Sequence, residues 1–162
     1  MITIDILLKA WRLMCTAAEM ASTYENNRPL CKYVHSTSRG HEAIQLATAF
    51  HLQPCDWVSP YYRDESILLG LGFEPYQLML QLLARADDPF TGGREYYSHP
   101  NYRGKDRPRM LHQSSATGMQ AIPSTGLAQG LRYLQQIGAS ESNESALVLC
   151  SLGDASITEG EV

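Results

Sequence analysis

Apolar residues recur at helical spacing over the first two dozen residues of the chain. They lie at Ile4, Leu7, Leu8, Trp11, Met14, Cys15 and Ala18. This period places them on one face of an α-helix. The run Glu25-Asn26-Asn27-Arg28-Pro29 is typical of a helix end. The pattern therefore predicts one amphipathic helix over the first two dozen residues.

Apolar runs predict three further helices and a strand before residue 90. Pro75 suits the first turn of a helix, where a missing N–H costs nothing. A short run between two prolines predicts the strand. In chain order these elements are a helix from Ser38 or Gly40 to Pro54, a strand at 56–60, a helix over Ile67–Leu71 and a helix over Tyr76–Ala86.

The segment 91–113 has no apolar period and holds five of the thirteen basic residues, Arg94, Arg103, Lys105, Arg107 and Arg109. A long loop of this kind in a compact domain is usually functional or mobile. After it, Ile122-Pro123-Ser124-Thr125 opens a predicted helix from Gly126 to Ile137, and Gly138 closes that helix.

A strongly apolar run closes the chain. Residues 147–152 predict a strand buried on both faces, and Gly153-Asp154 follows it directly. Helices alternating with strands favour an α/β fold with a parallel sheet. Because only two strands are predicted, and such a strand needs neighbours, we expect a truncated part of a larger domain. We divide the chain into a helical region, 1–55, and an incomplete cofactor domain, 56–162.

Composition excludes several classes of protein. The 162 residues are 44% hydrophobic and 19% charged, as in globular proteins, and the net charge is -4. An acidic balance argues against nucleic-acid binding, which depends on excess Lys and Arg.

No segment approaches a membrane span, so a cytoplasmic protein is expected. The four cysteines show no metal or redox spacing, and we expect reduced, mostly packed thiols. The exposed edge of the closing strand would favour a homo-oligomer.

Asp154 stands at the carboxyl end of a predicted parallel strand, where open α/β sheets bind ligands. A carboxylate there can hold Mg²⁺, which keeps waters and is usually bound through one or two carboxylates and phosphate oxygens. The alternative is that Gly153-Asp154 is only a turn, with Asp154 capping the next helix.

Five motifs in order resemble one family. They are Gly40-His41-Glu42-Ala43, Tyr62-Arg63-Asp64, Gly93-Arg94 with His99, Gln120-Ala121-Ile122-Pro123, and Gly153-Asp154 with Glu159-Gly160. Together they resemble the α component of thiamine-diphosphate-dependent 2-oxoacid dehydrogenases, of the pyruvate or branched-chain 2-oxoisovalerate type. The similarity runs from about residue 36 to the end of the chain. We assign catalysis to none of the five histidines.

The resemblance implies contacts to the cofactor diphosphate from Tyr62 and Arg63. A guanidinium fork matches phosphate oxygens better than an ammonium group does. The alternative for Arg63 is a surface ion pair with Asp64 or Glu65, worth little. Ser115 is a further candidate for a cofactor contact, and its alternative is a plain Ser/Thr-rich loop before a helix.

The resemblance also implies that Asp154 binds Mg²⁺ and that Ala155 and Ser156 contact the diphosphate. Ala155 replaces the glycine that is commoner in the family, so the turn must accommodate a Cβ. An asparagine that completes the Mg²⁺ shell would lie beyond residue 162, and an activating glutamate would come from the β component. We therefore expect an amino-terminal fragment that is inactive alone.

The implied reaction is decarboxylation of a 2-oxo acid and transfer of the acyl group to lipoamide. Its implied partners are a β subunit or β half and a lipoyl-bearing acyltransferase. Two alternatives stay open: a transketolase-like or other thiamine-diphosphate enzyme, and a non-catalytic interaction domain.

Overall fold

The structure is a computed structural model, which describes residues 2–33, 37–111, 114, 116–139, 145–160 and 162. Its contacts group the chain into two compact units, each described here by itself. The first unit comprises residues 1–51 and 62–98, and the second comprises 52–61 and 99–162. The regions 1–55 and 56–162 stay a prediction.

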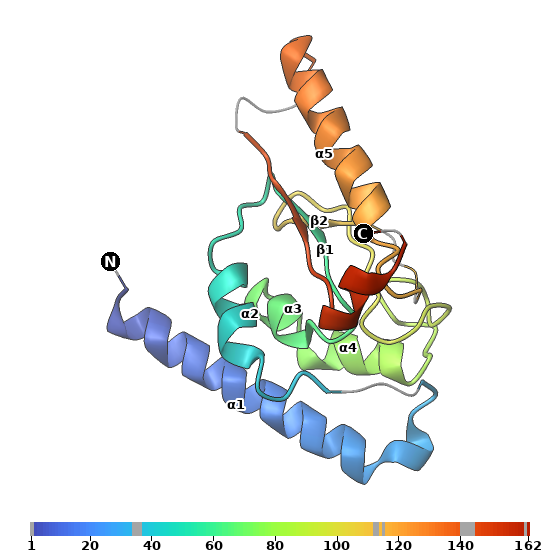
Figure 1. Ribbon diagram of the computed structural model, residues 1–162. Coiled ribbons are helices and arrows are strands. Elements are labelled where there is room, and N and C mark those ends of the chain that lie inside the picture. Colours follow the sequence, from blue (N-terminus) through green and yellow to red (C-terminus); the bar gives the residue numbers. More distant parts are fainter. Residues whose placement is uncertain (1, 34–36, 112–113, 115, 140–144, 161) are drawn as a thin grey trace. The chain divides into compact units, whose positions relative to one another are not determined.

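The first unit is helical (Figure 1). Its elements are α1 (Ile4–Asn26), the 3₁₀ turn η1 (Arg28–Leu30), α2 (Glu42–Ala49), α3 (Glu65–Gly70) and α4 (Pro75–Leu82). The four α-helices confirm those predicted from the sequence. α4 ends earlier than expected, because residue 84 has a positive φ of 50° that a helix cannot contain.

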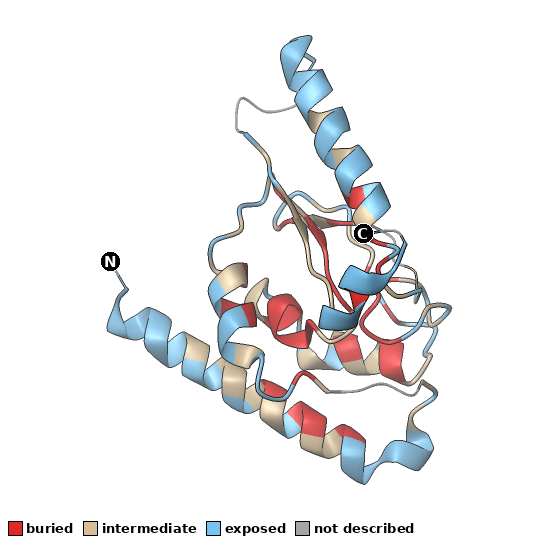
Figure 2. Cartoon of the chain, viewed as in Figure 1, coloured by how far each residue is buried: buried red, intermediate tan, exposed pale blue. Residues whose placement is uncertain are grey.

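α1 is buried only along its second half (Figure 2). Ala17, Met20, Ala21 and Tyr24 are buried, whereas Ile4, Leu7, Leu8 and Trp11 are exposed. Within its unit α1 packs on α2 and α3, which have eight and six residues. At 1.5 Å per residue these helices are too short to cover a helix of 23 residues. The apolar period thus predicted the helix correctly, but not which apolar residues are covered.

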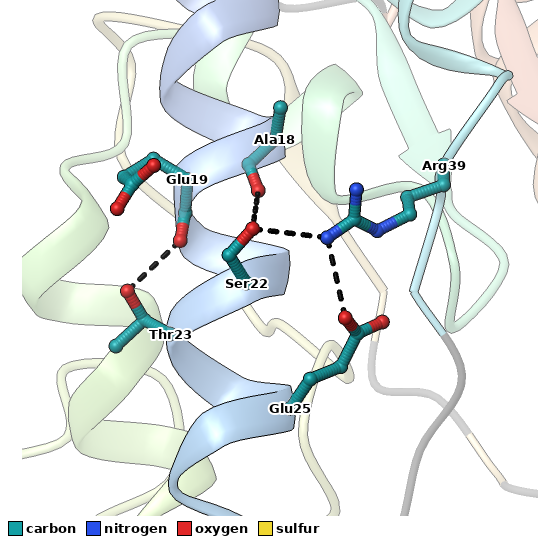
Figure 3. A network of polar contacts seen from close by, with 6 residues as sticks. All are labelled: Ala18, Glu19, Ser22, Thr23, Glu25 and Arg39. Atoms are coloured by element: carbon teal, nitrogen blue, oxygen red, sulfur yellow. Dashed lines mark hydrogen bonds and ion pairs between the residues drawn. The ribbon is translucent and has the colours of Figure 1, made fainter.

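Arg39 links the segment before α2 to the second half of α1 (Figure 3). Its Nη2 donates to Ser22 Oγ at 3.0 Å and forms an ion pair with Glu25 Oε2 at 3.2 Å. Ser22 in turn donates to the carbonyl of Ala18 at 3.1 Å. Because these groups are solvent-exposed, the ion pair orients the chain more than it stabilises it.

The second unit contains a parallel three-stranded sheet (Figure 1). Its elements are β1 (Trp57–Ser59), β2 (Arg109–Met110), α5 (Ala121–Gln136), β3 (Val148–Cys150) and the 3₁₀ helix η2 (Asp154–Thr158). The strand order is β2-β1-β3, with Trp57 in register with both Arg109 and Val148. This sheet with its helices confirms the predicted α/β class.

Two expectations about the sheet were wrong. The apolar closing strand is not buried on both faces: all three residues of β3 are half-buried and Leu147 is exposed, because β3 lies at an edge of the sheet. A strand was also missed, since β2 lies within the basic segment 91–113. Its two residues are held by pairing with β1 and by the Tyr102–Met110 bridge, and not by an apolar period of their own.

α5 begins at residue 121, five residues before the predicted start, and packs against β3. Of its described side chains only Ser124 is buried. No helix in the described residues is long and apolar enough to cross a membrane. All four cysteines are free, as expected, but the expected packing was wrong: Cys15 is exposed and Cys31, Cys55 and Cys150 are only half-buried.

Asp56 joins the turn before β1 to the start of β3. Its buried carboxylate accepts hydrogen bonds from the backbone N–H of Gln53 at 2.7 Å and of Leu147 at 2.9 Å. Gln53 lies in the turn before β1, and Leu147 directly precedes β3. The carboxylate therefore supports the β1–β3 pairing from its amino end.

Replacing Asp56 by Ala is expected to lower the free energy of unfolding by about 2 kcal/mol, since two backbone donors lose their charged acceptor. Urea denaturation followed by circular dichroism measures this loss. The matched control is Asp87→Ala, at an exposed position, which should change stability by less than about 0.5 kcal/mol. Equal effects of the two substitutions would contradict the role of Asp56.

Candidate functional site

The carboxyl ends of β1 and β3 meet at one edge of the sheet, because neighbouring parallel strands run in the same direction. Tyr61 follows β1, and Gly153 follows β3. A Cβ added to Gly153 would lie 2.8 Å from the hydroxyl oxygen of Tyr61. A side chain at this position would therefore require the Tyr61 ring to shift. The Gly-Asp turn is thus shaped by its packing against the end of the neighbouring strand.

Asp154 is the first residue of η2 and is exposed. Gly153 occupies the N-cap position, and no side chain caps this helix. Asp154 is therefore not the helix cap that the alternative interpretation required. Within the described residues, its carboxylate makes no hydrogen bond or ion pair. This leaves the carboxylate available to a cation.

Ala155 is compatible with the turn in this structure. Among the described non-glycine residues, only Ala84 and Ser98 have a positive φ. Ala155 lies inside η2 with a negative φ, so a Cβ causes no strain there. The departure from glycine that the sequence shows at this position has a simple conformational explanation.

Ser156 has a buried hydroxyl without a partner. The residue is fully buried, at 0% exposure, and within the described residues its Oγ makes no hydrogen bond. Its backbone N–H donates to the carbonyl of Gly153 at 3.0 Å. An unpaired buried hydroxyl costs free energy unless a further group satisfies it. A phosphate oxygen is an acceptor of the kind that this hydroxyl can satisfy.

The loop before α5 also reaches this edge of the sheet. The Gln120 side chain donates to the carbonyl of Ser151, just beyond β3, at 2.9 Å. Gly118 has a φ of +82°, and a Cβ there would lie 3.5 Å from the carbonyl oxygen of Ser156. Ser115 itself lies outside the described residues. In the second unit, the structure thus brings Asp154, Ala155 and Ser156 together with Tyr61 and Gln120.

Tyr62 and Arg63 belong to the first unit, and both are half-buried. The guanidinium of Arg63 lies over the ring of Tyr62, 4.8 Å from its centroid, which is a cation–π arrangement. The two side chains predicted to contact the cofactor therefore lie against each other.

Gln45 of α2 holds the turn that carries Tyr62 and Arg63. Its Nε2 donates to the carbonyl of Arg63 at 3.0 Å and to Asp64 Oδ1 at 3.1 Å. Its Oε1 accepts from the N–H of Ser66 at 3.2 Å. This residue is buried, with an exposure of 6%, and its three hydrogen bonds fix the position of the turn. It is separated from the turn by 18 residues or more, so no local sequence pattern indicated it.

Next to this turn, Glu65 lies in a buried cluster with two tyrosines. Tyr97 donates a hydrogen bond to Glu65 Oε2, and the hydroxyls of Tyr97 and Tyr24 are 2.9 Å apart. Burial raises the pKa of Glu65 to about 7, against the lowering effect of the tyrosine hydrogen bonds. Burial likewise raises the pKa of both tyrosines above the ordinary value.

Gly93 of the Gly93-Arg94 motif occupies a tight turn held by Asp88. Its φ is +73°, and a Cβ would lie 2.6 Å from the backbone of Ala84. The buried Asp88 carboxylate accepts from the N–H groups of Gly93 at 3.0 Å and Phe90 at 3.0 Å. His99, in the second unit, is buried.

In the part of the chain that the structure describes, no group of three or more His, Cys, Asp or Glu could hold a metal ion. A site that depends on Asp154 must therefore complete its shell with other oxygens. Phosphate oxygens and waters are such ligands for Mg²⁺.

A family model described as "Dehydrogenase E1 component" matches residues 11–162. The chain belongs to this family. The match confirms the resemblance drawn from the five motifs, and members of the E1 family depend on thiamine diphosphate.

The curated relatives of this chain are alpha subunits of two kinds of dehydrogenase, one named for 2-oxoisovalerate and one for pyruvate. The 2-oxoisovalerate dehydrogenase subunit alpha of Bacillus subtilis (strain 168) is 36% identical over 91 residues, which make up 56% of this chain and 27% of the relative. The 2-oxoisovalerate dehydrogenase subunit alpha 1, mitochondrial, of Arabidopsis thaliana is 28% identical over 138 residues, 85% of this chain and 27% of the relative.

The pyruvate dehydrogenase E1 component subunit alpha of Bacillus subtilis (strain 168) is 27% identical over 130 residues, 78% of this chain and 29% of the relative. The chain thus spans less than a third of the length of these relatives.

Glu65 makes the stability of this E1 component depend on pH. Its pKa is about 7 in the folded chain, above the ordinary carboxyl value of 4.5. The folded state therefore binds the proton more tightly, and the stability this adds is fully present below pH 4.5 and is lost as the pH rises through about 7. Between about pH 5 and about pH 8 the free energy of unfolding should fall by roughly 2 to 3 kcal/mol on this account.

Glu65→Gln should remove this part of the pH dependence, as measured by urea denaturation at the two pH values. Glu19→Gln, at an exposed position of α1, is the matched control and should keep the wild-type slope. A Glu65→Gln slope equal to that of the control would show that Glu65 does not titrate in this range.

Proposed function

We propose that this E1 component chain anchors the diphosphate and Mg²⁺ of thiamine diphosphate in a 2-oxoacid dehydrogenase. The observation that carries the proposal is the pair of unengaged groups at the carboxyl edge of the sheet, the Asp154 carboxylate and the buried Ser156 hydroxyl. Membership of the E1 family supports it.

Asp154 is the proposed Mg²⁺ ligand. It is exposed, and its carboxylate is unengaged within the described residues. Mg²⁺ is commonly bound through a single carboxylate when phosphate oxygens and waters supply the remaining ligands. Within the described residues, no group of three or more His, Cys, Asp or Glu could hold a metal ion, and a site with a single carboxylate needs no such group.

Ser156 and Ala155 are the proposed diphosphate contacts in the second unit. The Ser156 hydroxyl can donate to a phosphate oxygen, which would satisfy its unpaired buried group. Tyr62, Arg63 and Ser115 stay predicted contacts of the cofactor. For Arg63 the chemical reason is that a guanidinium fork forms short, charge-assisted hydrogen bonds to phosphate.

Thiamine diphosphate, when bound, supplies the nucleophile and the electron sink for decarboxylation of a 2-oxo acid. The residues of this chain would bind and orient it. We propose that the acyl group passes to lipoamide, and that a β component and a lipoyl-bearing acyltransferase are partners. The names of the relatives support a pyruvate or branched-chain 2-oxo acid as substrate.

Asp154→Asn should abolish Mg²⁺-dependent binding of thiamine diphosphate, because a neutral amide replaces the only charged protein ligand proposed for the ion. Calorimetric titration of thiamine diphosphate with and without Mg²⁺, using the E1 component assembled with its β component, measures this loss. Glu159→Gln removes an exposed carboxylate from the same segment and should leave binding unchanged. Unchanged Mg²⁺-dependent affinity in Asp154→Asn would remove Asp154 from the site.

The 162-residue chain alone should not release CO₂ from any 2-oxo acid. The reason is that the resemblance assigns the glutamate that activates the cofactor to the β component. A CO₂-release assay with pyruvate and 2-oxoisovalerate measures this, with the chain alone and with an added β component. Turnover by the chain alone would contradict this division of labour.

A further inference from the structure

A hollow with basic side chains in its wall lies in the unit that contains the sheet, apart from the candidate cofactor site. It encloses about 300 Å³ and is lined by Trp57 of β1, Arg109 of β2, and Asn101, Arg103 and Lys105 of the connecting segment. Met110 and Leu111 complete its wall. This volume is at the lower end of the range for small-molecule sites.

The hollow lies along β2, because both residues of that strand and the following Leu111 line it. Trp57 and Arg109 are the first residues of β1 and β2 and are paired in register. Tyr61 and Gly153 lie beyond the other ends of β1 and β3. β2 and β3 are the two outer strands of the sheet, on either side of β1, and no residue lines both the hollow and the carboxyl-edge site. The hollow is therefore distinct from the carboxyl-edge site.

The charge in the wall of the hollow is entirely positive. Arg103, Lys105 and Arg109 contribute three cations, and no acidic residue lines it. Two of these cations, Arg103 and Lys105, are exposed, and neither has an ion pair or hydrogen bond through its side chain within the described residues. In a chain with a net charge of -4, such a concentration of positive charge is unusual.

The two acidic residues adjacent in sequence to lining residues, Asp106 and Asp56, already have other partners. Asp106 accepts a hydrogen bond from Tyr102 and forms an ion pair with Arg107 at 3.0 Å. The Asp56 carboxylate is buried against the N–H groups of Gln53 and Leu147. Neither carboxylate neutralises Arg103 or Lys105 by a direct contact.

Trp57 gives the hollow an aromatic wall. The guanidinium of Arg109 lies over its ring, 5.3 Å from the centroid, which holds this cation beside the hollow. The indole Nε1 is buried and has no hydrogen-bond partner within the described residues. The wall thus combines an aromatic ring with three cationic side chains and has no acidic residue.

We propose that this hollow binds a small phosphate-bearing anion. Two guanidinium groups and one ammonium group match a dianion with several acceptor oxygens better than they match a monoanionic carboxylate. The enclosed volume favours a small molecule over a nucleic-acid strand. Tyr102, the aromatic residue nearest in sequence to the lining cations, is engaged by Asp106 and Arg107.

Inorganic phosphate is the probe, and Trp57 fluorescence is the readout. The chain has two tryptophans, so Trp11→Phe, at an exposed position of α1, makes Trp57 the sole reporter. Phosphate is titrated at constant ionic strength, with sodium chloride as the balancing salt. We expect a saturable change in fluorescence, because the anion would bind against the wall that contains the indole.

The double variant Arg103→Gln/Lys105→Gln should weaken phosphate binding at least about tenfold, since two charge-assisted contacts are lost. The control Arg85→Gln/Arg132→Gln removes two exposed cations elsewhere, has the same net charge, and should stay within about twofold of the parent.

Three results would overturn the proposal. The first is the absence of a saturable signal. The second is equal weakening in the two double variants, which would show a general charge effect. The third is much tighter binding of an oligothymidylate than of phosphate, which would point to a nucleic-acid strand. None of these measurements depends on thiamine diphosphate or on 2-oxo acid turnover.

Discussion

The parallel pairing of β1 with both β2 and β3 is the constraint on which the second unit depends. β1 is the central strand, and Val58 and Ser59 in it are almost inaccessible to solvent. Since all three strands run in one direction, the polar residues before them gather at one edge and those after them at the other. Asp56 ties the amino ends together, and the contact between Gly153 and Tyr61 brings the carboxyl ends together. Chemistry at either edge is therefore a consequence of strand direction.

Elements with a strong pattern of their own could be predicted from the sequence. The helix at Ile4–Asn26 and the strand around Trp57–Ser59 have an apolar period or prolines at their boundaries. β2 could not be predicted, because it is a two-residue strand that exists only through its pairing with β1. The burial of β3 was overestimated for a related reason. An apolar composition sets a preference for burial, but the position of a strand in the sheet decides how much burial it obtains.

The residues of the candidate site also divide into those that could be predicted from the sequence and those that could not. Asp154, Ala155 and Ser156 are consecutive, so their neighbourhood follows from the chain itself. Gln45 and Glu65 gave no local signal, because the partners that define them are distant in sequence: Arg63 is 18 residues from Gln45, and Tyr97 is 32 residues from Glu65. A buried glutamine or glutamate acquires its role from such partners. A single sequence contains the residues of these contacts without indicating which ones meet.

The candidate cofactor site and the hollow lined by Arg103, Lys105 and Arg109 differ in the sign of the charge that they present, and this difference has a chemical consequence. At the carboxyl edge the exposed Asp154 carboxylate would repel a bare phosphate, so an anionic ligand binds there favourably only together with a cation such as Mg²⁺. In the hollow along β2, Arg103, Lys105 and Arg109 would attract a phosphate directly and repel a metal ion. If both proposals hold, metal-bound and free phosphate groups would be directed to different places on the same sheet, one after β3 and one along β2. One sheet can discriminate between them through charge alone, before any shape complementarity is considered.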